Sequence, residues 1–184
     1  MDATRYELAV HECGHACCAL IVGHGARAVI VYDGGGGLCL PDLADASPPG
    51  TFDPEQPPET PAVVTDWKDA IVRAIRAAGG FVAVDLCLHP EKTETEIPDS
   101  DDRRRIETLA RGLMRGCDLY AQSAFVALAA AEARRRLRPF KWRIKLAARA
   151  LYERGRLSGD EVMAAMFPEH CCREEVSECA ECDG

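Results

Sequence analysis

Residues 8–18 read Leu-Ala-Val-His-Glu-Cys-Gly-His-Ala-Cys-Cys, with two histidines, His11 and His15, four positions apart. Residues at this spacing lie on the same face of a helix, so both imidazoles can bind one metal ion. The alternative is a helix in which two histidines occur incidentally. We favour the metal site, because a capped helix is expected over the same residues on independent grounds.

Glu12 follows the first histidine directly and extends the chemistry beyond metal binding. On a helix its carboxylate lies beside the metal. From there it can take a proton from water that the metal activates and pass it to the amine released from a peptide bond. The spacing His-Glu-x-x-His is typical of zinc peptidases. The stretch therefore predicts a zinc metallopeptidase in which Glu12 is the general base.

A catalytic zinc ion needs a third protein ligand. The compact metzincin pattern would place a glycine at position 18 and a histidine at position 21, where this chain has Cys18 and Ile21. That class is excluded, and the third ligand must come from another part of the sequence. From the residues alone these candidates stay open: Asp101, Asp102, Glu107, His89 and Cys18.

The remaining pattern predicts a mainly α (α+β) fold. Thr4 and Glu7 form a capping box at the start of the first helix, which ends at Gly23 and Gly25. Two strand-like segments, 28–32 and 38–40, flank four glycines and predict a β-hairpin. Helical segments follow at 62–78, where Gly79-Gly80 interrupts the pattern, and at 101–116, 119–137, 139–154 and after a capping box of Ser158 and Glu161. Residues 81–88 fit a helix or a strand.

Composition narrows the class of protein. The chain has 184 residues, 47% of them hydrophobic, and a net charge of −8, which is typical of a globular domain and argues against a dedicated nucleic-acid binder. No apolar run approaches the roughly 20 residues of a membrane span, and no signal peptide is visible. We therefore expect a soluble, cytoplasmic protein without membrane association, whose ten cysteines are reduced thiols.

Several stretches resemble one known family beyond the histidine motif. Residues 9–16, AVHECGHA, resemble the family pattern A-x-H-E-A-G-H-A, and residues 78–80 stand where the family has A-G-R. Residues 100–102, followed by Leu-Ala-Arg at 109–111, resemble its S-N-D segment, and residues 151–162, LYERGRLSGDEV, resemble its late L-x-x-x-x-x-L-x-G-x-E-[IV] stretch. The family is the zinc peptidase domain of the FtsH-type membrane AAA proteases, and the resemblance spans about residues 4–166.

This resemblance implies a helical, zincin-like peptidase domain over residues 1–168, with a small β-hairpin or sheet beside the metal. It implies that Asp102 is the third zinc ligand. It also implies a substrate-binding strand edge at Leu38, Cys39 and Leu40, which would take an extended peptide by strand addition.

The expected substrate and partners depend on two features of the family that are not visible in this sequence. Neither an ATPase domain nor a membrane anchor is visible, so we expect hydrolysis, without ATP, of unfolded or short substrates. A homo-oligomer or a separate ATPase partner is a further expectation. The alternative class is a non-catalytic, zinc-containing binding or regulatory protein on a peptidase fold. We prefer the enzyme, because metal binding alone does not require Glu12.

Three further segments stand out. Residues 134–149 carry eight basic residues and no acidic one, which fits a nucleic-acid patch or, as we favour, solvated helix faces. Residues 41–61 form a proline-rich loop insertion. Residues 169–184 form an acidic, cysteine-rich tail, whose candidates for a second metal site are His170, Cys171, Cys179 and Cys182.

Overall fold

The first helix, α1 (Ala3–Ile21), begins two residues earlier than the predicted capping box implies. The computed structural model describes residues 2–42, 66–92, 100–114 and 118–168. In it the side chain of Asp2 accepts hydrogen bonds from the backbone amides of Thr4 and Arg5, so Asp2 is the N-cap. The predicted capping box of Thr4 and Glu7 is therefore wrong. A carboxylate at the cap satisfies the free amides and also interacts favourably with the positive end of the helix.

The predicted hairpin is confirmed as β1 (Gly25–Val31) and β2 (Gly37–Asp42), which pair antiparallel with Ile30 opposite Leu38. A third strand, β3 (Arg156–Ser158), pairs with the other side of β1 and was not predicted. The order β2-β1-β3 leaves β2 at an edge of the sheet among the described strands. The residues predicted to bind substrate lie on this edge strand.

The second helix, α2 (Trp67–Leu88), is continuous through Gly79 and Gly80, so the predicted interruption is wrong. These glycines serve helix packing instead. A Cβ atom at Gly14 of α1 would lie 2.3 Å from the carbonyl oxygen of Gly79, which shows how closely the two helices cross. The packing gained outweighs the roughly 1 kcal/mol that a glycine costs inside a helix. Residues 81–88, which fitted either structure, are helical.

The remaining helices follow the predicted order. They are α3 (Asp101–Leu113), α4 (Leu119–Leu137), the short 3-10 helix η1 (Arg138–Phe140), α5 (Lys141–Arg154) and α6 (Gly159–Met166). Pro139 lies in η1, at a helix start, as its fixed backbone angle favours. The predicted capping box of Ser158 and Glu161 is confirmed at α6.

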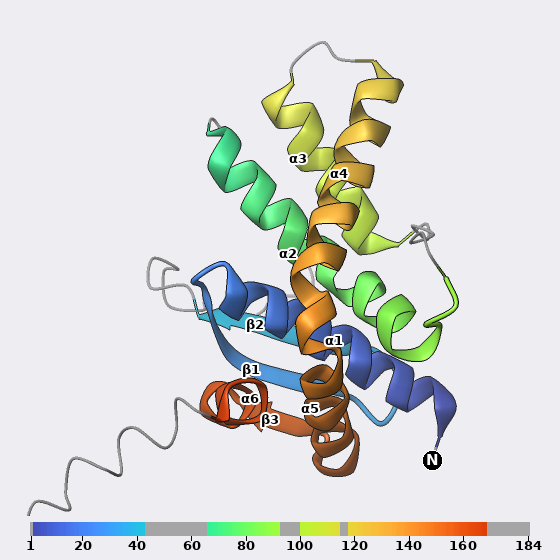
Figure 1. The fold of residues 1–184 in the computed structure, drawn as a ribbon, viewed down its shortest axis with the longest axis vertical. Helices are drawn as coiled ribbons and strands as arrows, with labels where there is room; N and C mark the ends of the chain where they lie inside the picture. The colour runs from blue at the N-terminus through green and yellow to red at the C-terminus, as the bar shows by residue number, and fades with distance from the viewer. Residues whose placement is uncertain (1, 43–65, 93–99, 115–117, 169–184) are drawn as a thin grey trace, which may run out of the picture.

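Figure 1 shows α1 crossing the middle of the molecule, with the sheet and α6 on one side and α2, α3 and α4 on the other. Helix α1 contacts α2, α5 and both strands of the hairpin, and nine of its residues are buried. The predicted fold class, mainly α with a small sheet, is confirmed. Because α1 lies between the sheet and α2, side chains on it can reach both.

Two predicted segments fall outside the described residues: the proline-rich loop, apart from its first two positions in β2, and the acidic tail. Among the helices that are described, none combines the length and the apolar character needed to cross a membrane.

Candidate metal centre

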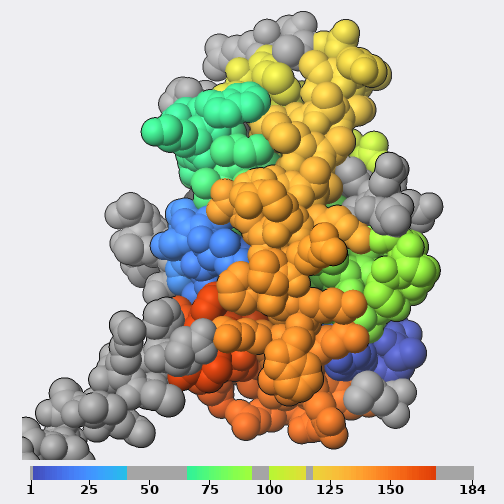
Figure 2. Space-filling model, viewed as in Figure 1, coloured from blue at the N-terminus to red at the C-terminus, as the bar shows by residue number. Residues whose placement is uncertain are grey.

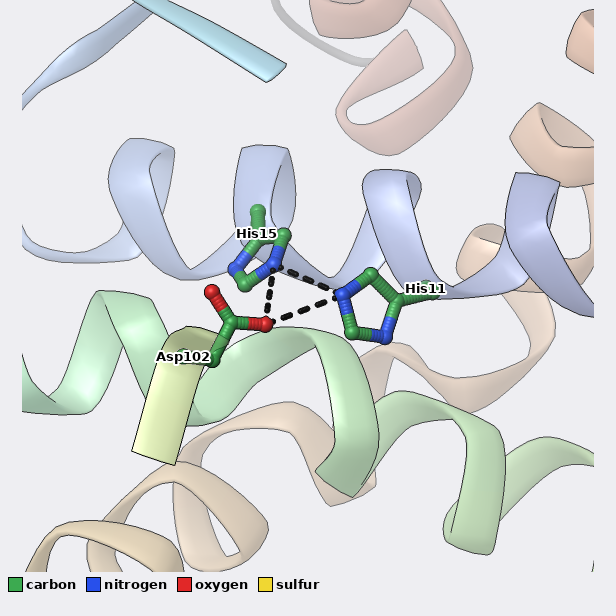
Figure 3. Close-up of side chains that lie close together, drawn as sticks. All are labelled: His11, His15 and Asp102. Atoms are coloured by element: carbon green, nitrogen blue, oxygen red, sulfur yellow. Dashed lines mark hydrogen bonds and ion pairs between the residues drawn. The ribbon is translucent and has the colours of Figure 1, made fainter. Parts of the chain in front are cut away.

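Three side chains from two helices converge on one point: His11 and His15 of α1 and Asp102 of α3 (Figure 3). Oδ2 of Asp102 lies 3.0 Å from Nε2 of His11 and 3.1 Å from Nε2 of His15. The two Nε2 atoms are 3.0 Å apart. The three atoms thus form a nearly equilateral triangle.

The local structure explains how each group arrives there. The two histidines lie one turn apart on α1, so their rings share a face, and the rings meet edge to face at 4.7 Å between centroids. Asp102 lies in the first turn of α3, which Ser100 starts by accepting a hydrogen bond from the amide of Arg103. The cap at Ser100 sets the start of α3, and the contacts with the two histidines orient the Asp102 carboxylate.

His15 is oriented by a second contact. Its Nδ1 lies 2.8 Å from the backbone carbonyl oxygen of Arg76 in α2. A carbonyl oxygen accepts hydrogen bonds, so Nδ1 carries a proton, and whenever the ring is neutral its lone pair is on Nε2. This is the tautomer that a metal ligand needs, and such backbone contacts commonly hold ligand histidines in place.

Gly80 provides the space in which the imidazoles meet. A Cβ atom at this position of α2 would lie 2.5 Å from Nε2 of His11 and 2.6 Å from Nε2 of His15. Real Cβ atoms do not approach other atoms so closely, so any larger residue would displace the rings. Sequence reasoning assigned Gly80 to a helix break and missed this role. The available signal was a glycine within a segment that otherwise fits a buried helix.

Charge is balanced within the group. Burial alone would raise the pKa of the Asp102 carboxyl, but hydrogen bonds from His11 and His15 and their positive charge hold that pKa well below its usual range. Burial opposes the charged form of His15, yet the contact with Asp102 raises the pKa of His15 above its ordinary value. Asp102 is therefore ionised at neutral pH, as a carboxylate ligand must be.

The donor set fits a metal ion. Around a tetrahedral ion with bonds of about 2.0–2.1 Å, neighbouring ligand atoms are about 3.3 Å apart, close to the separations of 3.0–3.1 Å observed here. Three ligands would leave one coordination position open, as in catalytic sites. Across the described residues, this is the one group of three or more such side chains close enough to hold a metal ion.

The other candidates for the third ligand do not reach the histidines. Asp101 is exposed and pairs with Arg104. Glu107 pairs with Arg103, and His89 lies near Glu91. Cys18 is buried against the backbone of α2 at Gly79. The candidates for a second metal site, His170, Cys171, Cys179 and Cys182, lie outside the described residues.

Glu12 lies beside the group, as its place after His11 requires, and it is 7% exposed. Burial raises the pKa of its carboxyl, and the nearby His15 and His11 partly oppose that shift. A Cβ atom at Gly37 of β2 would lie 2.6 Å from its Oε1, so the carboxylate rests on the first residue of the edge strand. Glu12 thus lies between the metal-binding group and β2.

The predicted substrate-binding residues follow directly along β2. Leu38 is 38% exposed, and Cys39 and Leu40 are partly buried. The structure therefore brings the edge strand to Glu12, and Glu12 to the histidines. Whether a peptide binds at this edge stays a prediction.

Comparison with known proteins assigns the chain to no family. No model of a known protein family matches the chain, and no curated protein sequence matches it.

Proposed function

We propose that the protein is a zinc-dependent metallopeptidase that acts on unfolded or short substrates without ATP. The observation that carries the proposal is the convergence of His11, His15 and Asp102, with the carboxylate of Glu12 beside them. Two imidazoles and one carboxylate form a ligand set that zinc peptidases use. The resemblance of residues 4–166 to the FtsH-type peptidase domain supports the same assignment.

His11, His15 and Asp102 would hold the zinc ion. Zinc at such a centre supplies Lewis acidity, which polarises a peptide carbonyl and acidifies water. The contact from Arg76 keeps His15 in the tautomer that binds. The negative charge of Asp102 would offset part of the charge of a divalent metal ion, and Asp102 is buried while both histidines are partly exposed.

Glu12 would carry the proton. Its carboxylate takes one proton from the attacking water as the water oxygen bonds to the carbonyl carbon. It then gives that proton to the amide nitrogen as the carbon–nitrogen bond breaks, and the amine leaves. The raised pKa of Glu12 brings it closer to the working pH and makes it a better acid in the second step.

The substrate backbone would pair with the free edge of β2. Strand addition requires an extended chain. A folded protein offers one after opening, which costs about 5–15 kcal/mol for a typical domain. We therefore expect cleavage of unfolded proteins and flexible peptides, with no effect of ATP.

The test is digestion of an unfolded protein by the purified full chain, with Glu12→Gln as the matched variant that keeps the metal ligands. Wild type should cleave, and Glu12→Gln should lose activity by about a hundredfold or more while keeping its metal. Equal, metal-independent background from both proteins would instead favour the non-catalytic binding protein.

Metal analysis tests the ligand set separately. His15→Ala and Asp102→Ala should lose zinc, whereas Asp101→Ala should keep it, because Asp101 is exposed and paired with Arg104. Zinc retained by Asp102→Ala would show that the ligand assignment is wrong. Iron in place of zinc would point to an oxygenase, since two histidines and a carboxylate also bind iron(II).

A further inference from the structure

Arg76 of α2 is a partly buried arginine without a partner for its charge. Within the part of the chain that the structure describes, its guanidinium makes no hydrogen bond and no ion pair. Arg73, one turn earlier on the same helix, is exposed and pairs with Asp69 at 2.9 Å. Burial lowers the pKa of Arg76, because it disfavours the charged form. Proteins normally pair a charge that they withdraw from water, so an anion would complete this position.

The backbone of Arg76 lies at the metal centre. Its carbonyl oxygen is 2.8 Å from Nδ1 of His15. Four residues further along α2, the space at Gly80 holds the rings of His11 and His15. Residues four positions apart share a face of a helix. The Arg76 side chain therefore leaves α2 on the face that is turned toward the metal ligands.

The edge strand β2 lies within electrostatic reach of the same guanidinium. Burial and the charge of Glu12 raise the pKa of the Cys39 thiol in β2 to about 12, and the positive charge of Arg76 opposes that shift. Cys39 belongs to the predicted substrate-binding edge and is thus close to both the proposed base and Arg76. Figure 2 shows the beginning of α2, in green, at the surface beside the blue end of α1.

The chemistry of a guanidinium favours a carboxylate. It carries five N–H donors in a planar fork, stays charged at neutral pH and binds both oxygens of a carboxylate at once. A peptide paired with β2 uses its backbone carbonyls in the strand ladder. Its carboxylates remain, either on the side chain of an aspartate or glutamate or at its C-terminus.

We propose that Arg76 binds a carboxylate of the substrate, so that the site selects peptides with an acidic group near the bond to be cleaved. The inference rests on the proposed peptidase function for the position of the peptide, whereas the ion pair itself needs no catalysis. Only the backbone carbonyl of Arg76 contacts His15. The side chain can therefore be replaced while that contact is kept.

Peptide binding without turnover tests the role of Arg76. The full chain carrying Glu12→Gln, loaded with zinc, is titrated into fluorescent amidated peptides of one neutral sequence, in which a single glutamate occupies each position in turn. Fluorescence anisotropy should show at least about tenfold tighter binding for glutamate than for glutamine at one or more positions. A neutral peptide with a free or an amidated C-terminus tests the terminal carboxylate in the same way. Absence of a preference in both series would overturn the proposal.

Replacing the side chain shows whether Arg76 causes the preference. Arg76→Gln, added to Glu12→Gln, should abolish it. Arg73→Gln is the matched control and should keep it, because Arg73 is exposed and paired with Asp69. A preference that survives Arg76→Gln would contradict the assignment.

Two further variants keep a charge at the position. Arg76→Lys should retain a smaller preference for the carboxylate, because lysine keeps the charge and loses the fork. Arg76→Glu should reverse the preference, so that a lysine in the peptide binds at least about tenfold more tightly than a glutamate. An unchanged preference for glutamate in Arg76→Glu would overturn the proposal.

Failure of the peptidase assignment gives a different result. Wild type that cleaves none of these peptides, while the preference due to Arg76 persists in binding, would contradict the peptidase and leave the carboxylate site standing. Wild type that cleaves peptides with and without the acidic group equally well would support the peptidase and overturn this inference.

Discussion

Gly37 lies directly against the side chain of Glu12: a Cβ atom at residue 37 would be 2.5 Å from Cγ and 2.6 Å from Oε1 of that glutamate. The first residue of the edge strand therefore sets where the carboxylate rests. No hydrogen bond between Glu12 and another described side chain does this instead. Packing against the backbone of β2 is what keeps the proposed base in place.

Gly37→Ala should separate metal binding from catalysis. The added methyl group would push the Glu12 carboxylate away while leaving the three metal ligands untouched. We expect unchanged metal content and a loss of kcat/KM of at least about tenfold, measured on an unfolded substrate. Gly34→Ala is the control, since a Cβ atom there meets nothing within 4 Å. Full activity of Gly37→Ala would show that the position of Glu12 does not matter.

Gly80→Ala should weaken metal binding. Its Cβ atom would collide with the ring nitrogens of His11 and His15, so both rings must turn away. We expect the metal dissociation constant to rise about 10- to 100-fold in competition with a chromophoric chelator.

Gly112→Ala in α3 is the matched control for that substitution. A Cβ atom at Gly112 has no neighbour within 4 Å. The alanine should leave metal affinity unchanged and raise the free energy of unfolding by about 0.5–1 kcal/mol, through its better helix propensity. Equal metal affinity in both variants would contradict the role assigned to Gly80.

Asp2→Ala should destabilise the protein more than Thr4→Ala. Asp2 accepts two backbone hydrogen bonds at the start of α1, whereas Thr4 lies inside the helix. Loss of the cap should lower the free energy of unfolding by about 1 kcal/mol, and Thr4→Ala should change it by less than about 0.5 kcal/mol. Urea unfolding followed by circular dichroism measures both. The reverse order would restore the capping box that the sequence predicts.

Glu132→Gln should cost stability at neutral pH but not in acid. Hydrogen bonds and ion pairs with Arg135, and then with Arg136, lower the pKa of Glu132 from 4.5 to about 2. A pKa that is lower in the folded state stabilises the fold above pH 4.5, and this contribution fades as the pH falls toward 2. We expect a deficit of about 0.5–1 kcal/mol at pH 7 that shrinks below pH 4.5. A deficit independent of pH would show that Glu132 acts through packing.

Features that depend on residues close together in the sequence could be predicted from it. Helical spacing brings His11, Glu12 and His15 together on α1, so this part of the site could be predicted before the structure was known. The third member could not be chosen from the residues, because Asp102 lies 87 positions from His15 and reaches it through tertiary packing. The family resemblance singled out Asp102, and the structure places its carboxylate at the histidines.

The errors have a common physical cause. Gly79 and Gly80 favour a break by propensity, yet close packing with α1 and the space needed by the histidines keep the helix continuous. Strand β3 has three residues, too few to show an alternating pattern, and exists because β1 offers it an edge. Both depend on neighbours distant in the sequence, which a local pattern does not contain.

The wide separation of Asp102 from the histidines has a consequence for folding. Three residues of α3 are buried, Asp102, Ile106 and Ala110, so this helix has little apolar surface with which to hold its place. A metal ion bound by all three ligands would cross-link α1 to α3. Such a cross-link closes a long loop and reduces the conformational entropy of the unfolded chain. Metal and fold would then be thermodynamically linked, and the affinity of the centre would include the work of keeping α3 docked.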